Sequence, residues 1–167
     1  MRILDSELTK RIESAFPATR CTGPITKFDN QQGEEFDEDQ FVFEALSGRT
    51  WKEVPRQFVR EHPGSLVLLG PEAFSAFLPI WLLCAMEEMN HENEVRELLI
   101  YSFCPKPDLV PDTSFLIRDW LRQLNSEQRQ TVRAFLAYCS SAEPSPFLRA
   151  HASRAVEFID NAEVSES

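Results

Sequence analysis

The sequence predicts an all-α fold, a compact irregular bundle of about seven helices around a central helix kinked by a proline. Three observations favour this class. Apolar residues recur at helical spacing along most of the chain, prolines separate the periodic segments, and the apolar run 65–69 has no second clear strand to pair with. Of the 167 residues, 43% are hydrophobic, so a single domain over 1–167 is expected to fold without metals or disulfides.

The first helix is expected to begin at Asp5 or Ser6, since either side chain can cap it, and to end before Pro17. Its apolar positions follow the spacing of one buried helical face: Leu8, Ile12, Ala15 and Phe16. Residues 17–35 contain glycine, proline and asparagine with little periodicity. A long loop is therefore predicted there, and it should be the most mobile segment.

A cluster of carboxylates ends this loop. Five of the six residues in 34–39 are acidic: Glu34, Glu35, Asp37, Glu38 and Asp39. They stand at the start of a helix that should end at Gly48, where negative charge interacts favourably with the helix dipole. A solvated face, a docking surface for a basic partner and a metal site are three possible uses. The EF-hand pattern does not fit, because Gln40 falls where that loop needs a glutamate.

Two helices and a connector are predicted next. Thr50 and Glu53 have the spacing of a capping box, which predicts a helix reaching His62 with an irregular first turn at Pro55. The run 65–69 is expected to be an extended connector. Pro71 opens the central helix, and Pro79 should divide it into two pieces at an angle, 72–78 and 80–89. The second piece is apolar nearly all round and should be the most buried helix.

The C-terminal part continues the helical pattern. One helix carries Val95, Leu98 and Leu99, and a short one carries Phe115, Leu116, Trp120 and Leu124. Asn125 or Ser126 is expected to cap the next, which has a stripe formed by Val132, Phe135, Leu136 and Cys139. Pro144 and Pro146 should separate it from a last helix. The polar tail 163–167 is expected to be frayed.

Charge and composition limit the classes of partner. With 27 acidic and 17 basic residues, the formal charge is −10, which repels nucleic-acid phosphates and anionic membrane surfaces. A basic protein surface is the complementary partner, although acidity can also serve solubility alone. The apolar stretch 76–86 is too short to span a bilayer, and residues 1–10 lack the apolar core of a secretory signal. The expected compartment is the cytoplasm.

No residue pattern points to catalysis, a metal or a cofactor. The four cysteines are widely separated and are expected to be reduced core thiols: Cys21, Cys84, Cys104 and Cys139. His62, His91 and His151 lie in separate segments without the spacing of a zinc helix. Nucleophile-elbow and phosphate-binding glycine motifs are absent from the sequence. Phe74, Phe77 and Trp81 have the helical spacing of core residues, and the alternative is that they line a pocket with Trp51.

Two stretches resemble a family of small bacterial proteins of unknown function. The first holds Trp51, the turn Leu69-Gly70-Pro71-Glu72-Ala73-Phe74 and the helix start Phe77-Leu78-Pro79. The second holds residues 124–129 and 135–138. Both stretches lie within residues 41–140. Each of these positions is explicable as a helix start, a kink or a core residue. The resemblance implies no reaction and no cofactor, but small acidic bacterial proteins of this size are often antidotes to toxins.

Our leading hypothesis is therefore a non-enzymatic protein-binding module. In its most concrete form it is an immunity-type inhibitor that binds and neutralises a basic bacterial toxin or effector through Glu34, Glu35, Asp37, Glu38 and Asp39. The alternative is a small-molecule-binding or enzymatic domain with a pocket near Trp51 and the Phe74–Trp81 kink, using Glu72 or Glu53 as a carboxylate. A structural subunit of a larger assembly is a third possibility.

Overall fold

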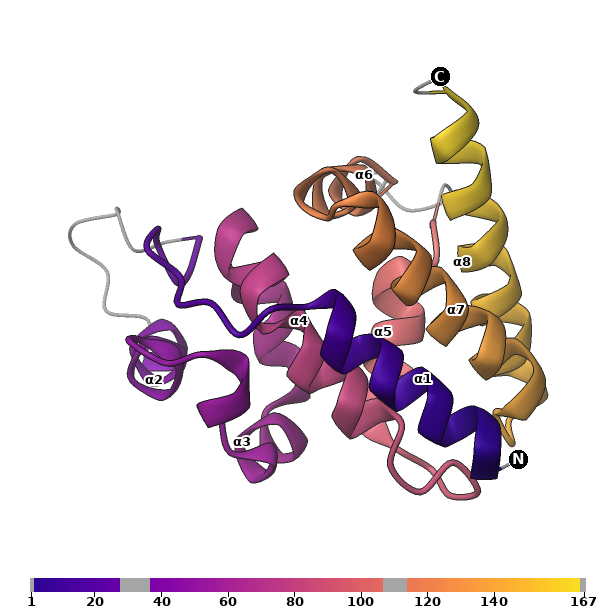
Figure 1. The fold of residues 1–167 in the computed structure, drawn as a ribbon, viewed down its shortest axis with the longest axis horizontal. Coiled ribbons are helices and arrows are strands. Elements are labelled where there is room, and N and C mark those ends of the chain that lie inside the picture. The colour runs from indigo at the N-terminus through magenta and orange to yellow at the C-terminus, as the bar shows by residue number, and fades with distance from the viewer. Residues whose placement is uncertain (1, 28–36, 107–113, 166–167) are drawn as a thin grey trace.

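A central helix, α4 (Pro71–Ala85), passes through the middle of the molecule, and the other helices pack around it (Figure 1). The structure is a computed structural model that describes residues 2–27, 37–106 and 114–165. In these ranges the remaining elements are α1 (Arg2–Ala15), α2 (Asp37–Leu46), η1 (Trp51–Glu53), α3 (Arg56–Glu61), η2 (Pro63–Leu68), α5 (Glu94–Phe103), α6 (Ser114–Gln123), α7 (Ser126–Ala142) and α8 (Pro146–Ser165). The predicted all-α class is confirmed.

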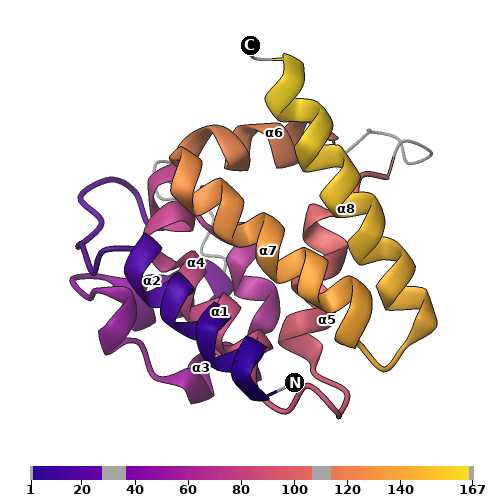
Figure 2. The same ribbon diagram turned by 45° about the vertical axis from the view of Figure 1, so that its right-hand side comes forward.

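Helices α7 and α8 form an antiparallel hairpin on one side, with α5 beside α8 (Figure 2). On the other side lie α2, α3 and the two short 3₁₀-helices η1 and η2, while α1 crosses between α4 and α7 (Figure 1). The hydrophobic core extends through both halves, because α4 contacts α1, α3, α5 and α6. This arrangement places the α4–α5 connection next to the turn that joins α7 to α8.

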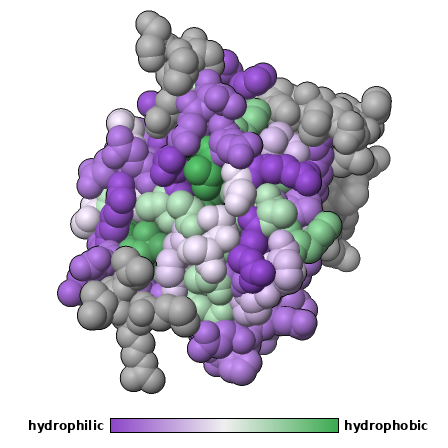
Figure 3. Space-filling view, turned by 90° about the vertical axis from the view of Figure 1, so that its right-hand side faces the viewer, coloured by the Kyte–Doolittle hydropathy of each residue, from purple (hydrophilic) through white to green (hydrophobic). Residues whose placement is uncertain are grey.

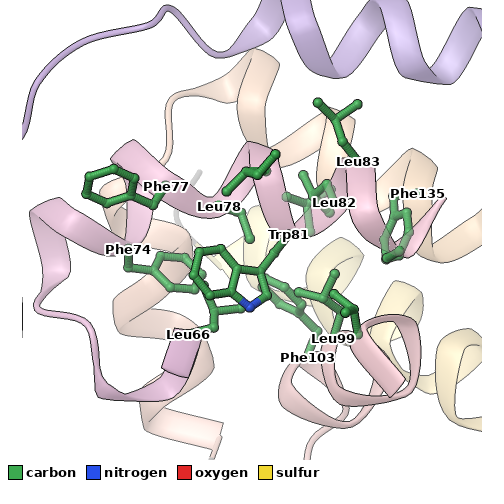
Figure 4. Packing of buried hydrophobic residues seen from close by; sticks show 14 of the residues in the cluster. Leu66, Phe74, Phe77, Leu78, Trp81, Leu82, Leu83, Leu99, Phe103 and Phe135 are labelled. Atoms are coloured by element: carbon green, nitrogen blue, oxygen red, sulfur yellow. The ribbon is translucent and has the colours of Figure 1, made fainter. Parts of the chain in front are cut away.

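The side chains of α4 fill the centre of the core (Figure 4). Phe74, Phe77 and Trp81 are fully buried, as the helical spacing predicts. Phe74 stacks on Trp120 of α6, with ring centroids 4.8 Å apart. The indole N–H of Trp81 donates to the carbonyl oxygen of Pro63 at 3.0 Å. Trp81 therefore joins the core to η2 through a satisfied polar group.

The expected division of α4 into two separate helices at Pro79 is wrong, and the kink at this residue stays a prediction. Helix α4 continues through this residue and ends at Ala85, before the predicted end at Met89. A proline inside a helix removes one hydrogen bond and costs about 3 kcal/mol. The neighbouring side chains on both sides of Pro79 are buried, including Leu78 and Ile80. Each contributes about 1.5–3 kcal/mol through burial, so packing outweighs the cost of the proline.

Two further local predictions are wrong. Asp5 and Ser6 do not cap α1, because the helix already begins at Arg2. Instead, Asp5 accepts a hydrogen bond from the hydroxyl group of Tyr138 on α7. The run 65–69 is neither a strand nor an extended connector, since most of it belongs to the 3₁₀-helix η2. Pro63 starts this helix, and the amide of Leu69 donates to the carbonyl of Leu66.

Several local signals are confirmed. Glu53 reaches back to accept from the amide of Thr50 at 2.7 Å, although Val54 and Pro55 separate η1 from α3 where one irregular helix was expected. Asn125 caps α7 and forms a reciprocal capping box with Gln128. Gly48 follows α2 with a positive φ of 71°, a conformation that suits glycine.

The predicted loop 17–35 is described only as far as residue 27. Residues 17–27 are not helical, and their end is fixed to the start of α4: the amide of Gly70 donates to the carbonyl of Ile25 at 2.9 Å. Residues 28–35 lie outside the described residues. At the other end of the chain, α8 reaches Ser165, so that it includes the first three residues of the tail expected to be frayed.

Candidate docking surface

A buried arginine organises the connection between α4 and α5. Arg96 is 0% exposed, and its Nε atom lies 2.5 Å from the Oε2 atom of Glu143. Its Nη1 atom donates to the carbonyl oxygens of Ala85 and Glu87 at 3.1 and 3.3 Å, and its Nη2 atom donates to that of His91. One guanidinium thus satisfies three backbone carbonyls and one buried carboxylate, which fixes the path of the connection.

Asn93 completes this arrangement. Its Oδ1 atom accepts from the amide of Arg96 at 3.0 Å and caps α5. Its Nδ2 atom donates to the carbonyls of Cys84 and Glu87 at 3.0 and 3.2 Å. The same side chain therefore joins the end of α4 to the start of α5. Glu88, between them, has a positive φ of 48°, which few non-glycine residues adopt.

Four glutamates project from this connection and from the first turn of α5, and we call them the glutamate rim: Glu88, Glu92, Glu94 and Glu97. All four are exposed. None of them has an ion-pair partner within the part of the chain that the structure describes. The one arginine in 87–97 is Arg96, and its charge is used inside the core. The rim consequently keeps its negative charge at the surface.

Glu87 differs from the rim because it is paired. Arg56 and Arg60 of α3 each lie 2.5 Å from one of its carboxylate oxygens. Burial acts to raise the pKa of Glu87, but the hydrogen bonds from the two arginines outweigh it and hold the pKa below its usual value. This carboxylate links α3 to the end of α4 and is not available to a partner.

A groove of about 440 Å³ lies beside the rim, between α5 and the start of α8. Glu92, Glu97 and Tyr101 line it from one side, and Ser145, Phe147 and Leu148 line it from the other. Phe147 is 61% exposed, the largest exposed fraction among the large hydrophobic residues that the structure describes. The side of the molecule formed by α7 and α8 shows apolar and weakly polar residues surrounded by hydrophilic ones (Figure 3). A charged rim next to an exposed aromatic residue is typical of a protein-docking surface.

The structure does not describe the side chains of the residues predicted from sequence to form the site. Glu34 and Glu35 lie outside the described residues. Asp37, Glu38 and Asp39 form the start of α2, and their side chains also fall outside the description. The acidic segment was predicted from its local density of carboxylates. It remains a prediction.

The aromatic residues of the alternative pocket are core residues. Trp51, Phe74, Phe77 and Trp81 are each at most 3% exposed. The indole N–H of Trp51 donates to the carbonyl oxygen of Phe16 at 3.0 Å. The core interpretation of these side chains is therefore confirmed.

The two carboxylates considered with that pocket have structural partners. The amide and hydroxyl of Thr22 donate to Glu72 at 2.9 and 3.1 Å, and these bonds, the amide bond first, lower the pKa of Glu72. The hydrogen bond from the amide of Thr50 likewise lowers the pKa of Glu53. Both groups fix the chain to a helix start.

The cysteines match the expected core thiols. All four are free, and three are buried: Cys84, Cys104 and Cys139. Burial raises the pKa of Cys84 to about 11 and that of Cys139 to about 12, and it also raises the pKa of Cys104. These thiols are protonated at neutral pH, which disfavours nucleophilic chemistry. Within the described ranges, no cluster of potential metal ligands occurs, and no helix is long and apolar enough to cross a membrane.

Sequence reasoning missed Arg96, Asn93 and Phe147. Asn93 was detectable, because it precedes Glu94 and Glu97 in the pattern of a helix cap followed by an acidic first turn. Phe147 follows Pro146 at the start of a helix, where nothing in the sequence distinguishes a core aromatic from an exposed one. The burial of Arg96 had no local signal.

Comparison with known proteins gives one match. A family described as a family of unknown function (DUF6714) matches residues 4–159. This confirms the resemblance to a family of unknown function. Neither a curated protein nor a solved structure matches the chain.

Proposed function

Because the chain belongs to this family of unknown function, DUF6714, we propose its role from its own surface. We propose that it is a non-enzymatic protein-binding module, in its most concrete form an immunity-type inhibitor that binds and neutralises a basic toxin or effector. The observation that carries the proposal is the glutamate rim, a surface of uncompensated negative charge on a fixed connection beside an exposed aromatic residue.

Charge supports a basic protein as the partner. The formal charge of −10 attracts a cationic surface over several ångströms, and complementary charges of this kind speed the encounter of two proteins. The rim concentrates four of these charges on one short stretch. A basic partner would meet the rim first and then bury Phe147 and its surroundings, which matches the usual arrangement of a polar rim around an apolar centre.

The fixed backbone also favours binding. Arg96 and Asn93 satisfy carbonyls of the α4–α5 connection before any partner arrives. A preformed surface loses less conformational entropy when it binds than a flexible one. The segment 34–39 is a second acidic surface predicted from the sequence. Reversing the charge of the rim and of this segment separately would show which of them the partner binds.

The test compares three variants with equal changes in charge. In the rim variant, all three of Glu92, Glu94 and Glu97 are changed to Lys. In the segment variant, all three of Glu35, Asp37 and Glu38 are changed to Lys. A matched control carries Glu7, Glu13 and Glu157→Lys, which are exposed residues of α1 and α8. A partner is isolated from the native host with the wild-type chain, and its association rate is measured against salt.

We expect the rim variant to slow association by about tenfold or more at low salt, because a repulsive surface replaces an attractive one. Wild-type association should fall steeply between low and physiological salt. In cells that express the partner, wild-type chain should restore growth and the rim variant should restore it less. If the partner is not toxic and all three variants associate equally fast, the inhibitor role and the rim are both rejected.

A further inference from the structure

We propose that the groove between α5 and α8 binds an arginine side chain of the protein partner, with the guanidinium against Tyr101 and Phe147 and paired with Glu97. This inference rests on the proposed function, because it names the chemical group that the docking surface recognises. It concerns short-range contacts in the groove, which shares Glu92 and Glu97 with the rim, whereas the charge of the whole rim acts at longer range.

The positions of these residues suit one flat cation. Glu97 and Tyr101 are four residues apart on α5, so they lie one turn apart on the same face, and both line the groove. Phe147 comes from the first turn of α8 on the opposite wall. The ring centroids of Tyr101 and Phe147 are 6.4 Å apart, and those of Tyr101 and His151 are 5.2 Å apart. A carboxylate thus stands beside an aromatic cluster in which Phe147 is exposed and Tyr101 and His151 are half-buried.

The electrostatics of the groove select a positive group. Glu92 and Glu97 are exposed on its lining and unpaired among the described residues. The third carboxylate, Glu143, is already neutralised by Arg96. Arg149, early in α8, donates to the carbonyls of Glu143 and Pro144 and so is held by the α7–α8 turn. An anion would meet repulsion here, and an apolar side chain would desolvate Glu97 without replacing its hydrogen bonds.

Tyr101 already binds a cation of the chain itself. The Nζ atom of Lys106 lies 5.2 Å from the centroid of its ring, within the range of a cation–π interaction. Lys106 therefore occupies one face of the ring, and an arginine of the partner would use the surface that Lys106 leaves. Arginine fits the remaining surface better than lysine, because its planar guanidinium can stack on an aromatic ring and pair with a carboxylate at the same time.

The experiment uses the full chain and two peptides, acetyl-Gly-Gly-Arg-Gly-Gly-amide and the same peptide with lysine. Binding is followed by the shifts of backbone amide signals in NMR titrations. We expect shifts to concentrate at residues 97–101 and 145–148, and we expect the arginine peptide to bind about three- to fivefold more tightly than the lysine peptide.

Three variants separate stacking from charge. Phe147→Leu should remove the preference for arginine while leaving the fold intact, because the side chain is 61% exposed. Glu97→Gln should weaken binding of both peptides. Phe43→Leu is the matched control, since Phe43 is 43% exposed on the distant helix α2 and should change neither affinity.

Shifts confined to Glu88, Glu92 and Glu94, or equal binding of both peptides that is insensitive to Phe147→Leu, would overturn the inference. That result leaves the proposed function standing if a protein partner still depends on the rim for its association rate. Conversely, selective binding of the arginine peptide supports the inference even if no toxic partner is found. The two failures are therefore distinguishable.

Discussion

At the scale of single residues, Arg96 is the side chain with the widest structural role. Arginine is rarely fully buried unless it is paired, and here a carboxylate and three carbonyls surround it. A buried ion pair adds little net stability by itself, because both charges lose their hydration. Its importance lies in what remains if one partner is removed: a buried charge and several carbonyls without donors.

We predict that Arg96→Met lowers the free energy of unfolding by about 3–5 kcal/mol, because Glu143 is then buried without a partner. Arg122→Met is the control: its pair with Asp119 lies on the surface, with side chains 63% and 57% exposed. That change should cost at most about 1 kcal/mol. Urea unfolding measures both. Equal losses in the two variants would show that Arg96 does not hold the connection.

The burial of Arg96 shows a limit of prediction from local sequence. Asn125 was one of two residues predicted to cap α7, because the signal, a polar residue before a helical stripe, lies within a few positions. Arg96 is flanked by Val95 and Glu97, and its partner Glu143 lies 47 residues further along the chain. A charged residue between such neighbours looks solvated, and only the packing of α8 against α5, with Glu143 at the end of α7, shows otherwise.

At the scale of elements, α4 shows which local sequence signals for helix starts and ends are overridden by tertiary packing. Pro71 was correctly predicted to open the helix, because a missing amide costs nothing in a first turn. Pro79 was expected to interrupt it, yet the helix continues. Likewise, the run 65–69 was expected to be extended but forms η2, where Leu66 is fully buried. In both places the local preference is worth less than the burial of adjacent side chains.

We predict that Trp81→Ala lowers the free energy of unfolding by about 3–5 kcal/mol, since it leaves a large cavity at the centre of the core. Trp81→Phe should cost less, because it keeps an aromatic ring but loses the hydrogen bond to Pro63. Denaturant melts of the two variants give the comparison. A loss below about 1 kcal/mol for Trp81→Ala would contradict the central position of α4.

At the scale of the whole molecule, the uneven placement of charge connects fold and function. The composition predicted an acidic surface and a basic partner, and the segment 34–39 stays a prediction of where that partner would dock. The position of the rim was not predictable, because it depends on Arg96 turning inward and on Arg56 and Arg60 being paired with Glu87. Charge density along the sequence does not show which charges are neutralised in the fold.

The rim divides into two pairs that should affect stability in opposite directions. Glu94 and Glu97 lie in the first turn of α5, where the helix dipole stabilises each negative charge by about 0.3–1 kcal/mol. Glu88 and Glu92 lie in the connection before the helix, outside its first turn, where the dipole stabilises them less and the other acidic residues repel them; Arg60 attracts Glu88 in part.

At low salt we therefore predict that changing both Glu88 and Glu92 to Gln raises the free energy of unfolding by a few tenths of a kcal/mol. Changing both Glu94 and Glu97 to Gln should instead lower it by about 0.6–2 kcal/mol. Raising NaCl from about 20 mM to about 0.5 M shortens the Debye length to a few ångströms and should reduce both differences. Urea unfolding at the two salt concentrations measures them. If both pairs destabilise equally at either salt concentration, the glutamates of the connection have structural partners, and they are not the free surface charge on which a basic protein would dock.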